Sequence, residues 1–277
     1  MSNLGRWGLS LVRPGAIAAV VSCFVLAGYI MFLENSLIYF PQKGGVGPSP
    51  GEDVFLTASD GVRIHGWYVA SAGAKTTLLW FHGNAGNLEN RRDMMEGLRE
   101  LRVHILAIDY RGYGKSEGRP DEPGVYRDGR AAYQWLVETK RAAPERIVVL
   151  GESLGAAVAC ELATQVKCGG LIIQSGFTSA AEMAPLVLPI FPARWFLRTK
   201  FDNLAKVSRI TCPKLFLHAV DDEVIPFAMG QRLCAAAAPP KECAWLQAGG
   251  HNGVFLRAAQ EYYPRLRKFL EKTGEEK

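Results

Sequence analysis

The stretch IVVLGESLG at residues 147–155 is an apolar run that leads directly into a serine between two glycines. Residues 156–166 follow it with a helix-like pattern. A serine between glycines at this spacing is typical of a sharp strand-to-helix turn, where the backbone at the serine is strained and only small neighbours fit. The turn holds the hydroxyl above the carboxyl edge of a sheet, at a helix N-terminus that favours negative charge. Ser153 is therefore the candidate nucleophile, and a helix cap without chemistry is the alternative.

Similar apolar runs recur along the rest of the chain and indicate strands that are buried on both faces. They lie at residues 76–81, 103–108, 171–173 and 215–217. Helical patterns separate them, at residues 89–101, 125–139, 154–166, 227–238 and 252–270. A hairpin is expected at residues 54–58 and 62–70, around the turn Asp60-Gly61. Strands separated by single helices predict an α/β fold, with a mostly parallel sheet covered by helices on both faces.

Composition excludes several classes of protein. The chain has 277 residues with 48% hydrophobic and 21% charged side chains, so it can build a packed core. Its net charge is +5, but the basic residues are scattered, which argues against a nucleic-acid partner. Neither CxxC nor HExxH occurs among its residues, and no motif implies a nucleotide. We therefore expect neither a cofactor nor a metal ion.

The N-terminal part of the chain carries the pattern of a membrane anchor. Residues 15–33 contain no charged side chain, and a helix of that length is roughly 29 Å long, close to the hydrocarbon thickness of a bilayer. Arg6 and Arg13 precede this stretch, and Glu34 follows it. The positive-inside rule then predicts a cytoplasmic N-terminus and a catalytic domain on the opposite, periplasmic or extracytoplasmic side of a single-pass membrane protein.

Two alternatives to an uncleaved signal anchor remain open: cleavage near residues 25–27, or lipid attachment at Cys23. The Gly- and Pro-rich composition that follows the anchor indicates a linker. The predicted organisation is a cytoplasmic segment at 1–14, an anchor at 15–33, a linker at 34–51 and one catalytic domain at 52–277.

A serine hydroxyl needs a base, and the base needs an orienting acid. Among the five histidines, His65 and His104 fit packing roles, and His82 fits bracing of the loop that it opens. His251 stands in a glycine-containing loop before the last predicted helix, which suits a ring that must reach Ser153. His251 is the candidate base.

The acid is expected in the loop after residues 215–217, which carries Asp221 and Asp222. Spacing alone does not choose between these two carboxylates. His218 lies close by, so a metal site formed by His218, Asp221 and Asp222 is a further alternative.

In combination these features resemble the α/β-hydrolase superfamily, with a triad in the order Ser153, Asp222, His251. The resemblance covers nearly everything from residue 36 onward. The nearest likeness is to short-lid, membrane-anchored serine hydrolases grouped with α/β-hydrolase domain-containing proteins 13 and 17. Three stretches carry it: SLIYFP at 36–41, HGNAGN at 82–87 and DYRGYGKS at 109–116.

The resemblance implies roles for individual residues. Residues 218–226 match the family's H-x3-D-x3-P pattern, which selects Asp222 as the acid. The backbone N–H groups of Leu154 and Asn84 are implied to form the oxyanion hole, with Ala85 as a neighbouring alternative. The side chain of Asn84 need not take part.

Residues 176–209 are predicted to cross the top of the site as a short lid rich in large apolar side chains. They either line an acyl pocket or pack as one face of a cap helix. Residues 109–116 are expected to buttress the site, with Tyr113 as a candidate for its entrance. An anchored enzyme with an apolar lid suggests lipidic or long-chain substrates.

The sequence therefore predicts a membrane-anchored serine hydrolase that cleaves acyl esters or thioesters through an acyl-enzyme intermediate. The alternatives are a peptidase or amidase on the same fold, and a hydrolase-like binding protein without catalysis. An extracytoplasmic domain would also allow a disulfide between Cys234 and Cys243.

Overall fold

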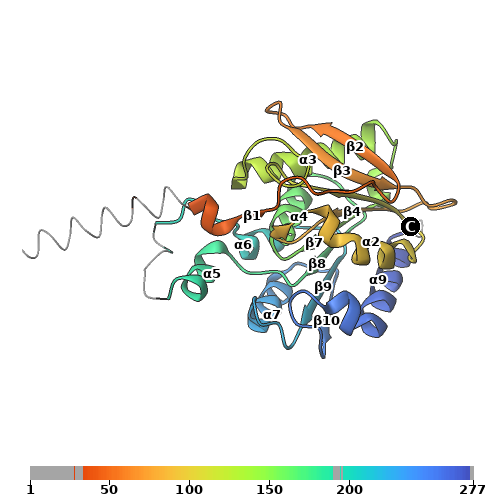
Figure 1. Cartoon of the computed structure of the whole chain (residues 1–277). Coiled ribbons are helices and arrows are strands. Elements are labelled where there is room, and N and C mark those ends of the chain that lie inside the picture. Colours follow the sequence, from red (N-terminus) through yellow and green to blue (C-terminus); the bar gives the residue numbers. More distant parts are fainter. Residues whose placement is uncertain (1–27, 29–33, 190–193, 195, 275–277) are drawn as a thin grey trace, which may run out of the picture.

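A computed structural model describes residue 28, residues 34–189, residue 194 and residues 196–274. At its centre lies an eight-stranded sheet with the strand order β10-β9-β8-β7-β4-β6-β3-β2 (Figure 1). In chain order its strands are β2 (Glu52–Thr57), β3 (Arg63–Val69), β4 (Thr77–Phe81), β6 (His104–Ile108), β7 (Ile147–Glu152), β8 (Gly170–Gln174), β9 (Lys214–Ala219) and β10 (Lys241–Leu246).

The strands from β10 to β6 run parallel. The edge departs from this pattern, because β3 is antiparallel to β6 and β2 is antiparallel to β3. Every residue of β4, β7, β8 and β9 is buried, as expected of strands covered on both faces. The predicted mostly parallel sheet and the hairpin around Asp60-Gly61 are thus confirmed, with Gly61 at a φ of 83°.

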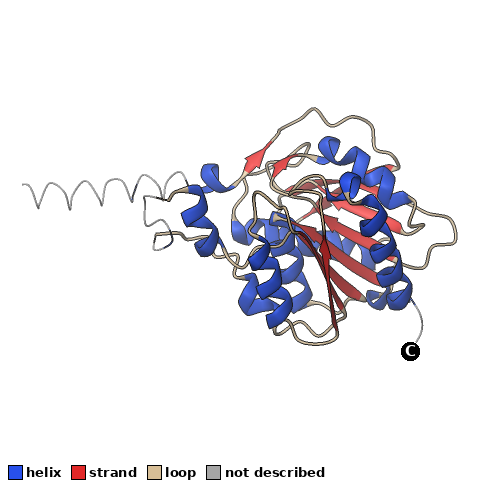
Figure 2. Cartoon of the chain, turned by 90° about the horizontal axis from the view of Figure 1, so that it is seen from below, coloured by secondary structure: helices blue, strands red, loops and turns tan. Residues whose placement is uncertain are grey.

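Helices cover both faces of this sheet (Figure 2). One apolar layer contains side chains of α3, α4, α6 and α7, and the opposite layer contains those of α2, α8 and α9. Their bounds are α2 (Arg92–Arg99), α3 (Glu122–Glu138), α4 (Leu154–Gln165), α6 (Asn203–Val207), α7 (Phe227–Ala236), α8 (Val254–Arg257) and α9 (Ala259–Gly274), and two short 3-10 helices lie at Leu88–Arg91 and Pro144–Arg146.

The parallel strands bring four loops to one edge of the sheet. The loop after β4 begins at His82, and the turn after β7 carries Ser153. The loops after β9 and β10 carry Asp222 and His251. Because the carboxyl ends of parallel strands share an edge, residues distant in sequence converge there.

Residues 34–51 depart from the predicted linker. Glu34 and Tyr39 are each only 2% exposed. β1 (Phe40–Pro41) forms a parallel pair with β5 (Ala85–Gly86), outside the main sheet. Composition indicates a free segment here, but buried side chains and strand pairing attach it to the domain. Residues 34–41 therefore have contacts with the domain that the composition of the segment does not indicate.

The predicted segments 1–14 and 15–33 lie outside the described residues, apart from residue 28. Among the helices that the structure does describe, none combines the length and the apolar character needed to span a bilayer.

The lid region contains α5 (Ala180–Val187) and α6, and its residues 190–193 and 195 lie outside the description. The carboxylate of Glu34 accepts hydrogen bonds from the backbone N–H groups of Arg198 at 3.1 Å and Thr199 at 2.6 Å. Burial raises the pKa of Glu34, but these hydrogen bonds outweigh it and lower the pKa below its ordinary value. Glu34 therefore connects the predicted lid, at Arg198 and Thr199, to the segment that precedes β1.

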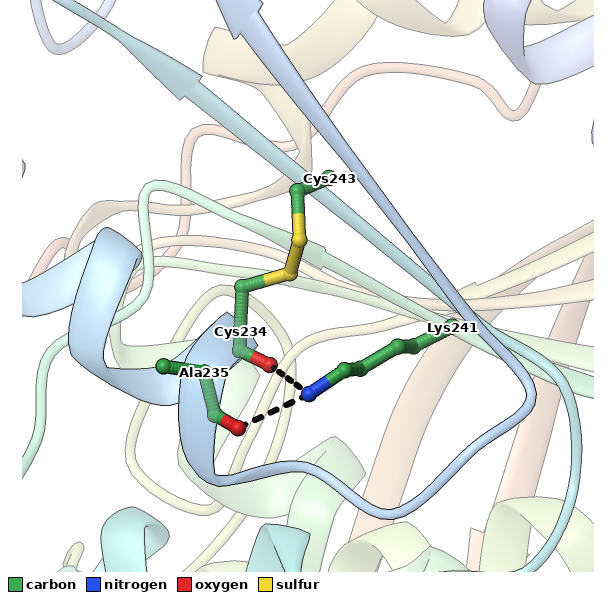
Figure 3. The surroundings of a disulfide bond; sticks show 4 residues. All are labelled: Cys234, Ala235, Lys241 and Cys243. Atoms are coloured by element: carbon green, nitrogen blue, oxygen red, sulfur yellow. Dashed lines mark hydrogen bonds between the residues drawn. A yellow bond between two sulfur atoms is a disulfide. The ribbon is translucent and has the colours of Figure 1, made fainter.

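A disulfide joins Cys234 of α7 to Cys243 of β10, with Cα atoms 6.2 Å apart (Figure 3). The ammonium group of Lys241 donates to the carbonyl oxygens of Cys234 and Ala235, at 2.7 and 2.8 Å. These contacts tie the C-terminal end of α7 to the edge strand. The pairing that the sequence left open is thus present in the structure.

A buried ion pair lies beside the hairpin. Arg111 is 5% exposed, and its guanidinium donates to Asp128, which is fully buried, at 2.8 Å. The same guanidinium donates to Asp60 at 2.7 Å. Arg127 also contacts Asp60, but its side chain is 45% exposed. Arg111 thus links the β2–β3 turn to α3.

We expect Arg111→Ala to lower the free energy of unfolding by about 3–5 kcal/mol, because it leaves Asp128 buried without a cation. Arg127→Ala removes only an exposed pair and is expected to cost less than about 1 kcal/mol. Urea unfolding followed by circular dichroism measures both. Equal effects of the two substitutions would contradict the buried role of Arg111.

Candidate active site

The turn at Ser153 has the strained geometry that its sequence predicts. Ser153 lies at φ 53° and ψ −112°, a region that non-glycine residues rarely adopt. A Cβ added to Gly155 would lie 2.0 Å from the carbonyl oxygen of Phe81, and one on Gly151 would lie 2.4 Å from that of Gly155. Both positions therefore require glycine. The turn holds Ser153 at the start of α4.

The three predicted triad side chains form one hydrogen-bonded chain. His251 Nε2 lies 3.0 Å from Ser153 Oγ. His251 Nδ1 lies 2.9 Å from Asp222 Oδ2. Asp222 is the carboxylate at the imidazole, and Asp221 lies elsewhere. The arrangement allows a proton to pass from the hydroxyl to the ring while the carboxylate orients the ring.

Asp222 is held as a buried carboxylate. Burial raises its pKa, but hydrogen bonds from His218, His251 and the N–H of Ile225 outweigh this and lower the pKa well below its ordinary value. The N–H groups of Val224 and Ile225 donate to Oδ1 at 3.0 and 2.8 Å. Asp222 is therefore ionised at neutral pH and can stabilise a charged imidazole ring.

The loop that carries His251 is fixed by the two acids that flank Asp222. Asp221 accepts a hydrogen bond from the N–H of Gly250 at 2.9 Å. Glu223 accepts one from the N–H of His251 at 2.9 Å. Three consecutive carboxylates thus hold one loop, the middle one through the ring and its neighbours through the backbone.

The predicted oxyanion donors lie in the same cavity as Ser153. Leu154 is the first residue of α4, where a backbone N–H has no acceptor within the helix. Asn84 follows the His82-Gly83 pair, and both Asn84 and Leu154 line the cavity. Within the described part of the chain, neither N–H donates a hydrogen bond to another backbone group. Both donors are thus available to a ligand.

His82 braces its loop, as predicted. It is fully buried, with Nδ1 2.7 Å from the carbonyl oxygen of Gly83 and Nε2 3.4 Å from Asp109 Oδ1. His65 lies on the other side of Asp109, with Nδ1 at 3.5 Å from Oδ2. Burial raises the pKa of Asp109, but contacts with both histidines lower it overall.

Tyr113 does not line the cavity, so the structure does not support the alternative that placed it at the entrance, and its contact with Asn84 fits the buttressing expected of residues 109–116. It is fully buried, and its hydroxyl donates to Asn84 Oδ1 at 2.9 Å. A tyrosine in a glycine-rich loop is expected to be exposed, but the side chain of Tyr113 is buried and contacts Asn84.

A cavity of about 730 Å³ opens beside Ser153 and His251. This volume lies within the range of about 300–1,000 Å³ that is common for small-molecule sites. Its wall is mostly apolar and comes from three parts of the chain: Leu37, Ile38 and Phe40 before the domain, Phe177, Met183, Ala184, Val187 and Leu188 in the lid, and Val224 and Ile225 after β9. A polar corner is formed by Arg91 and Glu152, whose Nε and Oε2 atoms are 3.8 Å apart.

The alternative metal site is not assembled. Among the described residues, no group of three or more His, Cys, Asp and Glu side chains could hold a metal ion. His218 Nε2 lies 3.0 Å from the carbonyl oxygen of Ile225 and 3.3 Å from Asp222, so its ring supports the acid loop.

Comparison with known proteins identifies the family. The alpha/beta hydrolase fold family matches residues 76–208. An uncharacterized protein of Mycobacterium tuberculosis is 37% identical over 96% of this chain and 99% of its own length. The alpha/beta hydrolase domain-containing protein WAV2 of Arabidopsis thaliana is 32% identical over 91% of this chain and 93% of its own. The chain belongs to the α/β-hydrolase family.

Solved structures agree on the fold. The Pyrococcus furiosus esterase Pf2001 has a TM-score of 0.72 and 21% identity, covering 85% of this α/β-hydrolase and 100% of the esterase. The esterase RhEst1 from Rhodococcus has a TM-score of 0.61 and 18% identity, covering 80% and 100% of the two chains.

Sequence reasoning about this α/β-hydrolase missed the support of the base loop. Asp221 and Glu223 act through backbone N–H groups, and no motif marks such contacts. It also missed the cavity wall before residue 52. The apolar residues of the segment 36–40 were a usable signal, since a free linker has no need of them.

Proposed function

We propose that this α/β-hydrolase is a membrane-anchored serine hydrolase that cleaves acyl esters or thioesters through an acyl-enzyme intermediate. The observation that carries the proposal is the continuous chain from Ser153 Oγ through His251 to Asp222, which opens into an apolar cavity. Within the family, the stretches at 36–41 and 82–87 favour the group that resembles α/β-hydrolase domain-containing proteins 13 and 17.

In the first half-reaction, Ser153 Oγ attacks the acyl carbonyl carbon while His251 Nε2 takes the hydroxyl proton. The negative charge that develops on the carbonyl oxygen is met by the N–H groups of Leu154 and Asn84. Collapse of the tetrahedral intermediate breaks the bond to the alcohol or thiol, which leaves with the proton from His251.

In the second half-reaction, water attacks the acyl-enzyme and gives a proton to His251. The carboxylic acid then leaves, and the proton returns to Ser153. The Asp222 carboxylate fixes the ring tautomer and stabilises the imidazolium in both steps. The arrangement needs no metal ion or cofactor.

The apolar wall favours a substrate with a hydrocarbon acyl chain. Leu37, Phe40, Val187 and Val224 line the cavity although each is exposed, between 38% and 60%, so an apolar rim surrounds the opening. Esterases among the solved structures of this fold, such as Pf2001, support ester cleavage.

We expect a fluorophosphonate probe to label the detergent-solubilised wild-type chain, and Ser153→Ala to abolish the labelling. His251→Ala and Asp222→Asn are expected to lower kcat for p-nitrophenyl esters by about 10⁴-fold, because the nucleophile loses its oriented base. Ser208→Ala, an exposed serine on the surface, is the matched control and keeps wild-type labelling. A folded wild-type chain that resists the probe would reject the serine mechanism.

The lid helix α5 supplies the test of the acyl pocket. Ala184 lines the cavity, whereas Leu186 on the same helix is 52% exposed and does not. We expect Ala184→Trp to shift the preferred p-nitrophenyl ester to a shorter chain, because the ring fills apolar space. Leu186→Trp is expected to leave the preference unchanged. An identical chain-length profile for both variants and the wild type would show that the acyl chain binds elsewhere.

The membrane part of the proposal rests on the uncharged stretch 15–33 and on the positive-inside rule. The disulfide between Cys234 and Cys243 supports a catalytic domain outside the cytoplasm, where disulfides persist. The substrate would then be an acyl ester or thioester on that side of the membrane.

The topology is tested by cysteine labelling of intact cells that produce the full chain. A membrane-impermeant maleimide is expected to label Ala72→Cys, in an exposed turn of the domain, but not Ser2→Cys until the cells are permeabilised. The unsubstituted chain measures the background from native thiols. The reverse pattern, or release of the protein by alkaline carbonate, would refute the proposed topology or the anchor.

A further inference from the structure

The segment between the predicted anchor and the domain lies directly on the oxyanion loop. We call residues 38–44 the strap and residues 82–87 the oxyanion loop. Strap residue Phe40 pairs with Ala85, and Pro41 pairs with Gly86. The N–H of Gln42 continues the pairing by donating to the carbonyl oxygen of Gly86 at 3.1 Å.

The side chain of Asn84 forms hydrogen bonds with the strap and with Tyr113. Its amide NH₂ donates to the carbonyl oxygen of Ile38. Its Oδ1 accepts from the N–H of Phe40 at 3.2 Å and from the hydroxyl of Tyr113 at 2.9 Å. Three hydrogen bonds to two distant segments therefore orient Asn84, whose own backbone N–H is one of the two proposed oxyanion donors.

A second asparagine fixes the other end of the oxyanion loop. Asn87 is fully buried, and its amide NH₂ donates to the carbonyl oxygens of Gln42 and Gly44, at 3.2 and 2.7 Å. The strap is in turn held by Gly114, whose backbone exchanges hydrogen bonds with Gln42 and Gly44 at 2.9 and 2.8 Å. The strap thus lies between the oxyanion loop and the loop that carries Tyr113.

The contact between the strap and the oxyanion loop matters for catalysis because it affects the position of an oxyanion donor. A donor stabilises an oxyanion only when it lies about 2.7–3.1 Å from the position that the charged oxygen will take. The loop at 82–87 has little regular structure of its own, because β5 spans only Ala85–Gly86. Its backbone is therefore set by what binds its side chains.

We propose that the Asn84 side chain is a positioning residue for catalysis, and that the strap, acting through it, fixes the oxyanion hole. The inference rests on the proposed serine hydrolase function. It assigns to the HGNAGN motif a role beyond its backbone: both asparagine side chains serve to bind the strap. The strap, which lies close to the predicted anchor in sequence, thus contributes to the active site by holding the oxyanion loop in place.

The test compares Asn84→Ala, Asn84→Asp and Tyr113→Phe in the full chain, with the concentration of reactive sites measured by fluorophosphonate titration. Asn84→Asp keeps the acceptor for Phe40 and Tyr113 but loses the donor to Ile38. Tyr113→Phe removes one hydroxyl and serves if the alanine variant fails to fold. Tyr133→Phe is the matched control. Its hydroxyl also donates one hydrogen bond, in this case to the carbonyl oxygen of Lys167 at 2.6 Å, and Tyr133 does not line the cavity.

We expect Asn84→Ala to lower kcat per reactive site by about 100-fold with little change in KM, the loss typical of one oxyanion donor. Asn84→Asp and Tyr113→Phe are expected to lower it less, and Tyr133→Phe not at all. A trifluoromethyl ketone, which binds as a tetrahedral adduct, should lose affinity in proportion to kcat/KM across the series. A merely structural role would lower thermal stability without this proportionality.

Wild-type kcat and ketone affinity in Asn84→Ala, with the wild-type chain active, would overturn the inference and leave the proposed function intact. The same holds if activity falls only because fewer sites are folded. A wild-type chain that neither reacts with the fluorophosphonate nor hydrolyses the esters would overturn both.

Discussion

The carbonyl oxygen of Phe81 lies where a side chain on Gly155 would begin, so α4 starts in direct backbone contact with the end of β4. This close approach places the turn after β7 beside the loop after β4. It also forces Ser153 into its positive-φ conformation, because the chain must reverse within a few residues. Ser153, the proposed nucleophile, and the oxyanion loop are neighbours because of this one contact. The other parts of the site are arranged around it.

The three acidic residues next to the loop that carries His251 have two different roles. Asp222 is buried and binds the ring of His251, whereas Asp221 and Glu223 accept hydrogen bonds from the loop backbone. Flanking acids hold the loop, so the middle acid is left to orient the imidazole. A loop with adjacent glycines at 249 and 250 needs such external support, since both have positive φ and lack side chains that could pack.

Much of the fold could be predicted because buried parallel strands appear as short apolar runs, and the GESLG turn marks where one strand meets its helix. The convergence of Ser153 and His251 follows from the shared edge of parallel strands. The choice between Asp221 and Asp222 required a family resemblance, since spacing did not separate them. The strap could not be predicted because its partners, Asn84 and Asn87, are about forty residues away in sequence. A Gly- and Pro-rich composition does not indicate such contacts.

Glu34 gives the domain a different N-terminal limit from the one that composition suggests. Its carboxylate binds the lid backbone at Arg198 and Thr199, and the next residues supply cavity wall and strap. A soluble form of the protein intended for crystallisation or assay must therefore begin before Glu34. A chain started at residue 52 would keep every triad residue, yet it would lack the partners of Asn84 and one wall of the cavity. Lack of activity in such a truncation would therefore not count against the proposed function.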